Sequence, residues 1–271
     1  MPLFMRLSQS KNTPLIMGIL NVTPDSFSDG GRYNTLTSAV DHALQMIEDG
    51  ADMIDIGGES TRPGAQPISA EEEERRIVPV IQEIRKVSQI YLSIDTYKPQ
   101  VMTKVIDLGI NMINDVRALR NKGSLSVIAN SSVDVCLMHM QGTPESMQAN
   151  PVYSSVVEEV EKFLTSRVEA CEKGGISRNR IVLDPGFGFG KTQTDNALLF
   201  QSIGHFVGLK LPVLVGISRK SMVKNIIGES MGDIILTSAF LAALASKNGA
   251  SILRVHDIKE TKKMLNFLET T

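Results

Sequence analysis

The sequence of 271 residues lacks the features that mark several large classes of protein. It has no long hydrophobic run, because the longest, Ala239–Ala245, is far shorter than the roughly 18 residues that span a membrane. Residues 1–14 contain one arginine and no sustained apolar stretch, so no signal peptide is expected. Neither charge is in excess, with 28 Lys and Arg against 30 Asp and Glu, and no basic stripe is present. We therefore expect neither a nucleic acid nor a membrane as partner.

Cysteine is also scarce. Cys136 and Cys171 form no CxxC pair and have no nearby metal ligands, which favours two reduced structural thiols and a cytoplasmic location. The composition, 42% hydrophobic and 21% charged, is that of an ordinary globular protein with a large core. A chain of this length can form two domains, but α/β barrels of roughly 250 residues form one. Because no linker divides the sequence, a single domain over residues 1–271 is expected.

Eight short apolar segments, each ending in a polar residue, are predicted to be strands of a parallel sheet, because near-continuous apolar runs suit strands buried on both faces. These are Leu15–Asn21, Met53–Gly58, Ile90–Thr96, Met112–Val116, Asp134–His139, Ile181–Gly186, Pro212–Ser218 and Ser251–Asp257. Helical patterns lie between most of them: Ser38–Asp49, one opened by Ser69, one opened by Pro99, Val152–Gly174, Asn196–Ile203, Lys220–Ile227, Ile234–Lys247 and Ile258–Leu268. Eight such units predict a (β/α)₈ TIM barrel, with a doubly wound open sheet as the alternative. Residues 1–14 are expected to be an N-terminal extension or a short strand.

Polar residues stand at nearly every predicted strand exit: Asn21, Glu59, Asp95, Asn114, His139, Asp184, Ser218, Lys220, Arg254 and His256. The C-terminal ends of barrel strands form the active site, so this convergence predicts one. Lys220 begins a helix, an unfavourable place for a cation unless an acidic group such as Asp184 lies nearby. Arg254 and His256 share a strand face and predict an anion site. A salt bridge from this pair to Asp257 or Glu260 outside the barrel is the alternative.

Two exits are long and rich in glycine, and we predict that they form lids over the site. The first, Asn21–Gly31, runs for roughly 15 residues before the next helix, against a usual 2–6. In the second, Gly57–Ala65, Arg62 is either a surface cation or an anion-binding group. The segment Pro185–Thr192 fails both nucleotide motifs, because Pro185 replaces the first glycine of a P-loop and Lys191 the last of a dinucleotide fingerprint. It is interpreted as a turn that carries Phe187 or Phe189 over a flat substrate.

From about residue 15 to the end, the sequence resembles the dihydropteroate synthases of folate biosynthesis. The matching blocks are Asn21–Gly31, Asp55–Ala65, Ser93–Thr96, Ile113–Val116, Asp184–Lys191, Ser218–Ser221 and Arg254–Asp257. The resemblance implies condensation of 6-hydroxymethyl-7,8-dihydropterin diphosphate with p-aminobenzoate, giving 7,8-dihydropteroate and diphosphate. It also implies a dissociative mechanism through a pterin cation, and a homodimer formed by helices near the last strands. The apolar stripe Phe240–Ala245 could equally be barrel core.

The resemblance further implies a role for each site residue. Residues implied to hold the pterin are Asp95, Asn114, Asp184 and Lys220, with Met138 and Phe189 near its ring. Asn21, Arg254 and His256 would engage the diphosphate, and Asn21 would also bind Mg²⁺. Residues implied to line the p-aminobenzoate site are Thr61, Arg62, Pro63 and Ser218, while Gly216 and Val255 complete the substrate site. The implied catalytic residues are Lys220, Asp95, Asp184, Arg254, His256, Arg62 and Asp29.

Two other functions are weighed against this one. A barrel that passes a methyl group from a folate to a corrinoid protein would share the Asp, Asn and Asp pterin contacts but would not need the diphosphate set or the two long loops. A barrel that binds pterin without catalysis would be expected to have lost Lys220, Arg62 or the pair on the last strand, and none is lost.

Overall fold

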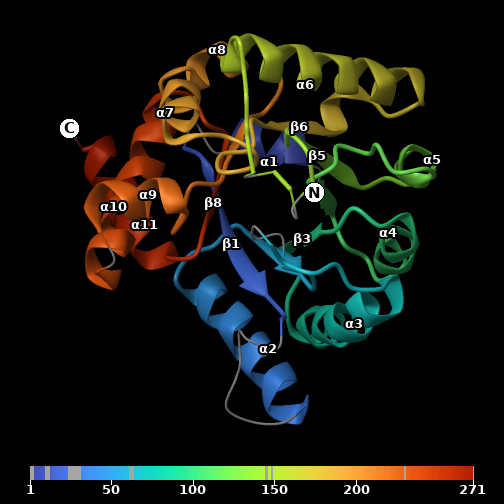
Figure 1. Cartoon of the computed structure of the whole chain (residues 1–271). Coiled ribbons are helices and arrows are strands. Elements are labelled where there is room, and N and C mark those ends of the chain that lie inside the picture. Colours follow the sequence, from blue (N-terminus) through green and yellow to red (C-terminus); the bar gives the residue numbers. More distant parts are fainter. Residues whose placement is uncertain are drawn as a thin grey trace.

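In the computed structural model of the protein, helices surround eight parallel strands (Figure 1). It describes residues 3–9, 13–23, 32–60, 64–143, 146–147, 149–228 and 230–270. The strands are β1 Leu15–Asn21, β2 Met53–Gly57, β3 Tyr91–Asp95, β4 Met112–Asp115, β5 Asp134–Met138, β6 Ile181–Asp184, β7 Leu214–Val215 and β8 Ile252–Val255. The helices are α1 Leu3–Gln9, α2 Arg32–Glu48, α3 Ala70–Val87, α4 Pro99–Ile106, α5 Ser124–Ala129, α6 Val156–Lys173, η2 Arg178–Arg180, α7 Gln193–Gln201, α8 Ile203–Val207, α9 Ser221–Ile227, α10 Met231–Lys247 and α11 Ile258–Glu269.

The strands pair in the order β6-β5-β4-β3-β2-β1-β8-β7. The two ends of this order meet at a parallel bridge between Leu183 and Val213, where Leu183 N also donates to Pro212 O at 2.9 Å. The sheet therefore closes on itself, which confirms the (β/α)₈ barrel and rules out the doubly wound open sheet. Because every strand is parallel, all carboxyl ends open at one mouth.

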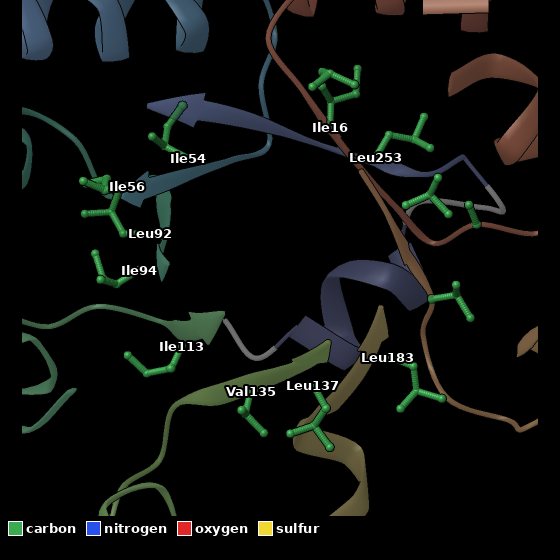
Figure 2. Close-up of a cluster of buried hydrophobic side chains, with 14 of the residues drawn as sticks. Ile16, Ile54, Ile56, Leu92, Ile94, Ile113, Val135, Leu137, Leu183 and Leu253 are labelled. Carbon is green, nitrogen blue, oxygen red and sulfur yellow. The ribbon is translucent and has the colours of Figure 1, made fainter. Parts of the chain in front are cut away.

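Because successive side chains of a strand point to opposite faces, the strands contribute to two separate apolar layers. One face of each strand packs against the helices, as the outward side chains in Figure 2 show: Ile16, Ile54, Ile56, Leu92, Ile94, Ile113, Val135, Leu137, Leu183 and Leu253. The other face fills the barrel interior toward its N-terminal end, with Met17, Met53, Tyr91, Met112, Cys136, Val182, Leu214 and Ile252. The polar side chains of this inner face begin at the next inward position of the strands, two residues closer to their C-terminal ends.

Residues 3–9 form the helix α1, so of the two alternatives for this segment, an extension or a short strand, the short strand was wrong. Leu3 and Leu7, four residues apart on one helix face, pack against the interior cluster of the barrel. Leu3 N donates to Asp134 Oδ2 at 3.3 Å, and Tyr91 OH donates to the same oxygen. The helix therefore covers the end of the barrel opposite to the mouth.

Several other elements also differ from the prediction. Regular pairing in β7 is confined to Leu214–Val215, because the following residues already turn toward α9. The helix α5 was not predicted. It has only six residues, and its N-cap is Gly123, which has a φ of 95° and no side chain to cap the helix. The helix α2 begins at Arg32, so the first long loop is shorter than predicted.

No described helix is by itself long and apolar enough to cross a membrane. One bent pair, α9 with α10, meets that requirement of length and composition only when the two helices are taken together.

Candidate active site

A hydrogen-bonded network of charged and amide groups forms the floor of the barrel mouth. Arg254 Nε donates to Asp55 Oδ2 at 2.6 Å, and Arg254 Nη2 donates to Asp95 Oδ2 at 3.0 Å. Asn114 Nδ2 donates to the same Asp55 oxygen at 3.0 Å. Side chains from β2, β3, β4 and β8 are thus linked across the barrel, with the Asp55 carboxylate at the centre.

The strand register places these groups side by side. Asn21 on β1 pairs with Gly57 on β2, which pairs with Asp95 on β3, which in turn pairs with Asn114 on β4. All four residues face inward, because each lies an even number of positions from an interior residue of its own strand. The sequence prediction that the strand-end residues Asn21, Asp95 and Asn114 meet at one place is confirmed.

Three buried oxygen atoms of the floor have no hydrogen-bond partner among the described residues: Asp55 Oδ1, Ser93 Oγ and Asn114 Oδ1. They come from adjacent strands, since Asp55 pairs with Ser93 and Asn114 lies on the next strand. A buried polar atom without a partner costs free energy, and most such atoms in native proteins are paired. A flat ligand whose edge carries N–H groups would satisfy them.

Burial also shifts the protonation of two carboxyl groups in the mouth. Loss of solvent raises the pKa of Asp95 to about 7, which Arg254 opposes and Asp55 reinforces. Burial likewise raises the pKa of Asp184, opposed first by the nearby Lys220 ammonium. Asp184 Oδ1 accepts a hydrogen bond from Gly186 N at 2.7 Å. Perturbed carboxyl groups of this kind, lying in one concave mouth, are typical of functional sites.

Lys220 enters the mouth from the turn between β7 and α9. Arg219 has a φ of 57°, and this left-handed residue reverses the chain just before Lys220. Lys220 Nζ donates to Phe187 O and lies 4.6 Å from the centre of the Phe189 ring. Burial lowers the pKa of Lys220 to about 8, an effect that the Asp184 carboxylate opposes. The acidic neighbour expected for this lysine is therefore present.

An apolar wall stands beside these polar groups. Tyr97, Val116, Met138 and Met140 form one buried cluster against which Phe189 packs. Met138 and Phe189, both predicted near a flat ring, therefore lie together on the same side of the mouth. Phe187 differs from the prediction, because it is fully buried and packs edge-on against Phe200.

The exits of β7 and β8 are tied together by two contacts. Ser218 Oγ lies 3.0 Å from His256 Nδ1, and Arg219 Nε donates to Asp257 Oδ2 at 3.0 Å. Asp257 is thus the partner of Arg219, and the alternative in which Arg254 forms an ion pair outside the barrel was wrong. Gly216 precedes this exit, where a Cβ would lie 3.7 Å from Arg254 Cβ.

Some predicted site residues do not appear in this arrangement. The side chain of Val255 lies in the outer core against the helices and does not reach the mouth, because it alternates with the inward Arg254. Four more predictions fall outside the described residues: Asp29, Thr61, Arg62 and Pro63.

Asn21 carries an amide oxygen of the kind that a divalent cation takes as a ligand. A Cβ on Gly57 would lie 3.8 Å from Asn21 Oδ1 and 4.0 Å from Asp95 Oδ2, so both oxygens border the space above this glycine. Amide and carboxylate oxygens are ligands that Mg²⁺ takes in proteins, together with water and substrate phosphates. The described residues contain no cluster of three or more His, Cys, Asp or Glu side chains that could hold a metal alone. This donor set fits Mg²⁺ delivered with a phosphate-bearing substrate.

Two residues of the floor were missed at the sequence level. Asp55 and Ser93 lie two positions before the strand ends, so they face inward one layer deeper than Gly57 and Asp95. A polar residue inside an otherwise apolar strand, in phase with the strand end, is the signal that could have identified them.

Comparison with known proteins agrees with this site. A family model described as pterin binding enzyme matches residues 17–256. The dihydropteroate synthase of Escherichia coli (strain K12) is 45% identical over 258 residues, covering 95% of this chain and 92% of that protein. The Yersinia pestis dihydropteroate synthase, solved with a sulfonamide drug complex, has a TM-score of 0.91 at 44% identity and covers 97% and 94% of the two chains.

Two structures of the Xanthomonas albilineans dihydropteroate synthase match as well. The one with 4-aminobenzoic acid has a TM-score of 0.89 at 44% identity, covering 95% of this chain and 93% of that chain. The one with 7,8-dihydropteroate has a TM-score of 0.84 at 39% identity, covering 95% and 92%.

The barrel and its floor of hydrogen-bonding groups define a barrel enzyme of the pterin-binding class. The chain belongs to that family and, within it, to the dihydropteroate synthases. The reaction is the transfer of a pterinylmethyl group from 6-hydroxymethyl-7,8-dihydropterin diphosphate to p-aminobenzoate in folate biosynthesis. The corrinoid methyltransferase and the non-catalytic barrel find no support in these relatives.

Proposed function

We propose that this condensation is a dissociative substitution in which the floor of the mouth binds the pterin ring. The observation that carries the proposal is the group of buried unpaired acceptors, Asp55 Oδ1, Ser93 Oγ and Asn114 Oδ1. An aminopyrimidinone edge presents several N–H donors, which such acceptors would pair. Asp184 accepts from the same ring, and the Lys220 ammonium donates to its carbonyl and ring nitrogen. The ring lies against Met138 and Phe189.

In the proposed reaction, the bond between the pterin methylene carbon and the diphosphate oxygen breaks first, and its electron pair leaves with diphosphate. The resulting cation is spread over the pterin ring, where the Asp95 and Asp184 carboxylates stabilise it. The aniline nitrogen of p-aminobenzoate then attacks the methylene carbon and loses a proton. No nucleophilic side chain is required.

We assign the binding of the diphosphate leaving group to residues at the exit of β8 and to Asn21. Arg254 has five N–H donors, and its contacts with Asp55 and Asp95 use two of them, so others are available to phosphate oxygens. His256, held by Ser218, adds a second donor toward the same side. Asn21 would hold Mg²⁺, which when bound neutralises charge on the departing diphosphate. We assign the p-aminobenzoate wall to Thr61, Arg62, Pro63 and Ser218, and propose that Asp29 pairs with Arg62 when the loops close.

Exchange of Asp184 for asparagine tests the pterin site. Asp184 Oδ1 already accepts from Gly186 N, so in Asp184→Asn the amide oxygen stays there and the amide NH₂ meets a substrate N–H. Charge-assisted hydrogen bonds contribute about 1.5–3 kcal/mol, so pterin affinity should fall by roughly one to two decades. Calorimetric titration with 6-hydroxymethyl pterin measures this loss of affinity. The matched control is Asp41→Asn, which changes an exposed residue of α2. An unchanged affinity in Asp184→Asn would remove this residue from the site.

We also propose a homodimer that forms through the last helices. These helices carry large apolar side chains that are more than half exposed: Ile226, Met231, Leu236, Phe240 and Phe267. In the stripe Phe240–Ala245, Ala242, Ala243 and Ala245 belong to the core, whereas Phe240 faces outward. Exposed apolar patches of this kind mark interaction surfaces. Because Cys136 and Cys171 are free and buried, we assign this dimer to a reducing compartment such as the cytoplasm.

The double variant Leu236→Asp/Phe240→Asp is expected to be monomeric, because two charges would be buried without partners at the interface. Sedimentation velocity compares it with the unaltered chain and with Val87→Asp, which places the same charge on an apolar residue 65% exposed on α3. Both of those should sediment as dimers. A monomer in the unaltered chain would contradict the proposal.

A further inference from the structure

Lys191 is a buried lysine that the reaction as described does not use. It is 3% exposed, and its Nζ lies 2.8 Å from Gly186 O, 3.0 Å from Phe189 O, 3.0 Å from His139 Nδ1 and 3.5 Å from His139 O. An ammonium group has three N–H donors and no acceptor, so this geometry uses all three. Its partners are two carbonyls of one turn and a histidine at the exit of β5.

This arrangement is costly for a lysine. Among the described residues, no carboxylate lies within salt-bridge distance of Lys191 Nζ, and burial lowers the pKa of Lys191 to about 7, which Asp184 opposes. The nearby Lys220 lowers it further, and Asp195 raises it. Burial, followed by the charge of Lys191, lowers the pKa of His139 to about 2, so this histidine is a neutral partner. Burying a cation without an ionic partner costs stability, and the question is what its hydrogen bonds contribute to the neighbouring site.

The lysine lies beneath a turn that has little freedom. Gly186 has a φ of 73°, and a Cβ there would lie 1.9 Å from His139 O. Gly190 has a φ of 62°, and its carbonyl accepts a hydrogen bond from Tyr153 OH at 2.7 Å. The turn formed by residues 186–190 is thus held by hydrogen bonds from Lys191 and Tyr153 and by its close packing against the exit of β5.

The opposite side of the same turn contacts Lys220. Phe187 O accepts from Lys220 Nζ, the Phe189 ring lies beneath that ammonium, and a Cβ on Gly188 would lie 3.2 Å from Lys220 Cδ. Phe187 O and the Phe189 ring therefore set the position of Lys220 Nζ, and the two carbonyls on either side of them, Gly186 O and Phe189 O, are the ones that Lys191 holds.

We propose that Lys191 is a positioning residue for the pterin site. By binding Gly186 O and Phe189 O, it holds the turn 186–190 in the position that directs Lys220 Nζ toward the pterin. The inference rests on the proposed role of Lys220 as a pterin ligand. Lys191 itself touches no substrate and acts through Lys220.

A double-mutant cycle between Lys191→Met and Lys220→Met tests this, with the affinity for 6-hydroxymethyl pterin as the readout. Lys191→Met should weaken pterin binding about 10-fold in the unaltered chain, but no more than about 2-fold when Lys220 is already methionine, because residues that act as a unit are non-additive. Lys173→Met, on an exposed lysine of α6, is the matched control and should leave affinity unchanged.

Tyr153→Phe provides a second, milder variant if Lys191→Met does not fold. It removes only the hydroxyl that holds Gly190 O, and its smaller loss of affinity, about 2- to 5-fold, should also vanish in the Lys220→Met background. Equal losses in both backgrounds would overturn the inference while leaving the pterin role of Lys220 intact. An unchanged pterin affinity in Lys220→Met alone would instead contradict the proposed function, and the inference with it.

Discussion

Replacement of Arg254 by methionine is expected to lower the free energy of unfolding by roughly 3–5 kcal/mol. The side chain of Arg254 is 17% exposed and binds two carboxylates, Asp55 at 0% and Asp95 at 10% exposure. Methionine keeps the aliphatic stem but removes the guanidinium, so both buried carboxyl groups lose the cation that binds them. Urea denaturation of the purified variant measures the loss.

Two further variants separate this cause from a simple loss of packing. In Arg254→Met/Asp55→Asn one stranded charge is removed as well, so part of the lost stability should return. Arg75→Met breaks the exposed pair with Glu72 on α3 and should change stability little, because solvent screens that pair. If the double variant is less stable than Arg254→Met, the ionic explanation is wrong.

The same substitution should change the pH dependence of pterin binding. Burial raises the pKa of Asp95 to about 7, and Arg254 holds it from rising further. In the proposed site Asp95 accepts substrate hydrogen bonds as a carboxylate, so we expect pterin affinity to fall as the pH drops through about 7 and the group is protonated. Without Arg254 the pKa of Asp95 rises, and this fall should move to higher pH. Titrations between pH 6 and 8.5 in both proteins measure the shift.

This network revises one division suggested by the sequence. The resemblance separated a pterin set, Asp95, Asn114, Asp184 and Lys220, from a diphosphate set, Asn21, Arg254 and His256. In the structure Arg254 binds two floor carboxylates, so its loss should weaken the bare pterin as well as the diphosphate ester. We therefore expect this one guanidinium to couple the binding of the ring to the binding of the leaving group.

Much of the barrel could be read from the sequence, because parallel strands buried on both faces leave near-continuous apolar runs. The strand-end residues Asn21, Asp95, Asn114 and Asp184 followed from the same pattern, since barrel topology alone brings strand ends together. What the pattern could not show is which side chains bind one another across the barrel. The link from Arg254 to Asp55 joins residues 199 positions apart, and nothing local in the sequence encodes it.

Local signals also failed where tertiary packing decides the conformation. The helix α5 has six residues and no side-chain cap, so its sequence carries little helical signal. The helix α1 forms because Leu3 and Leu7 can cover the open end of the barrel, a site that exists only once the strands have closed. The carbonyls bound by Lys191 are equally invisible in sequence, where Lys191 is the last residue of a glycine-rich segment.

The two loops at the mouth lead to a prediction about binding order. The first leaves β1 at Asn21, the proposed Mg²⁺ ligand, and the second carries Thr61, Arg62 and Pro63, the proposed p-aminobenzoate wall. The second loop has fixed ends, because Glu59 Oε2 accepts from Ile68 N at 3.1 Å. The sequence between these ends is rich in Gly, Ser and Pro and poor in apolar residues, and from this composition we predict that a bound ligand supplies contacts that order the loop.

Mg²⁺ and diphosphate are expected to supply those contacts and thereby to complete the p-aminobenzoate site. If the first ligand orders Arg62 and its neighbours, the second binds without that entropic cost, and the two are coupled by about 1–3 kcal/mol, or roughly 5- to 150-fold in affinity. We therefore expect p-aminobenzoate to bind tightly only when Mg²⁺ and diphosphate are both present. Calorimetric titration at fixed ionic strength compares the complete mixture with Mg²⁺ alone and with diphosphate alone. In Asn21→Ala the gain from the complete mixture should shrink, because diphosphate then lacks its metal anchor on the first loop. Identical dissociation constants in all arms would show that neither loop contributes to the second substrate site.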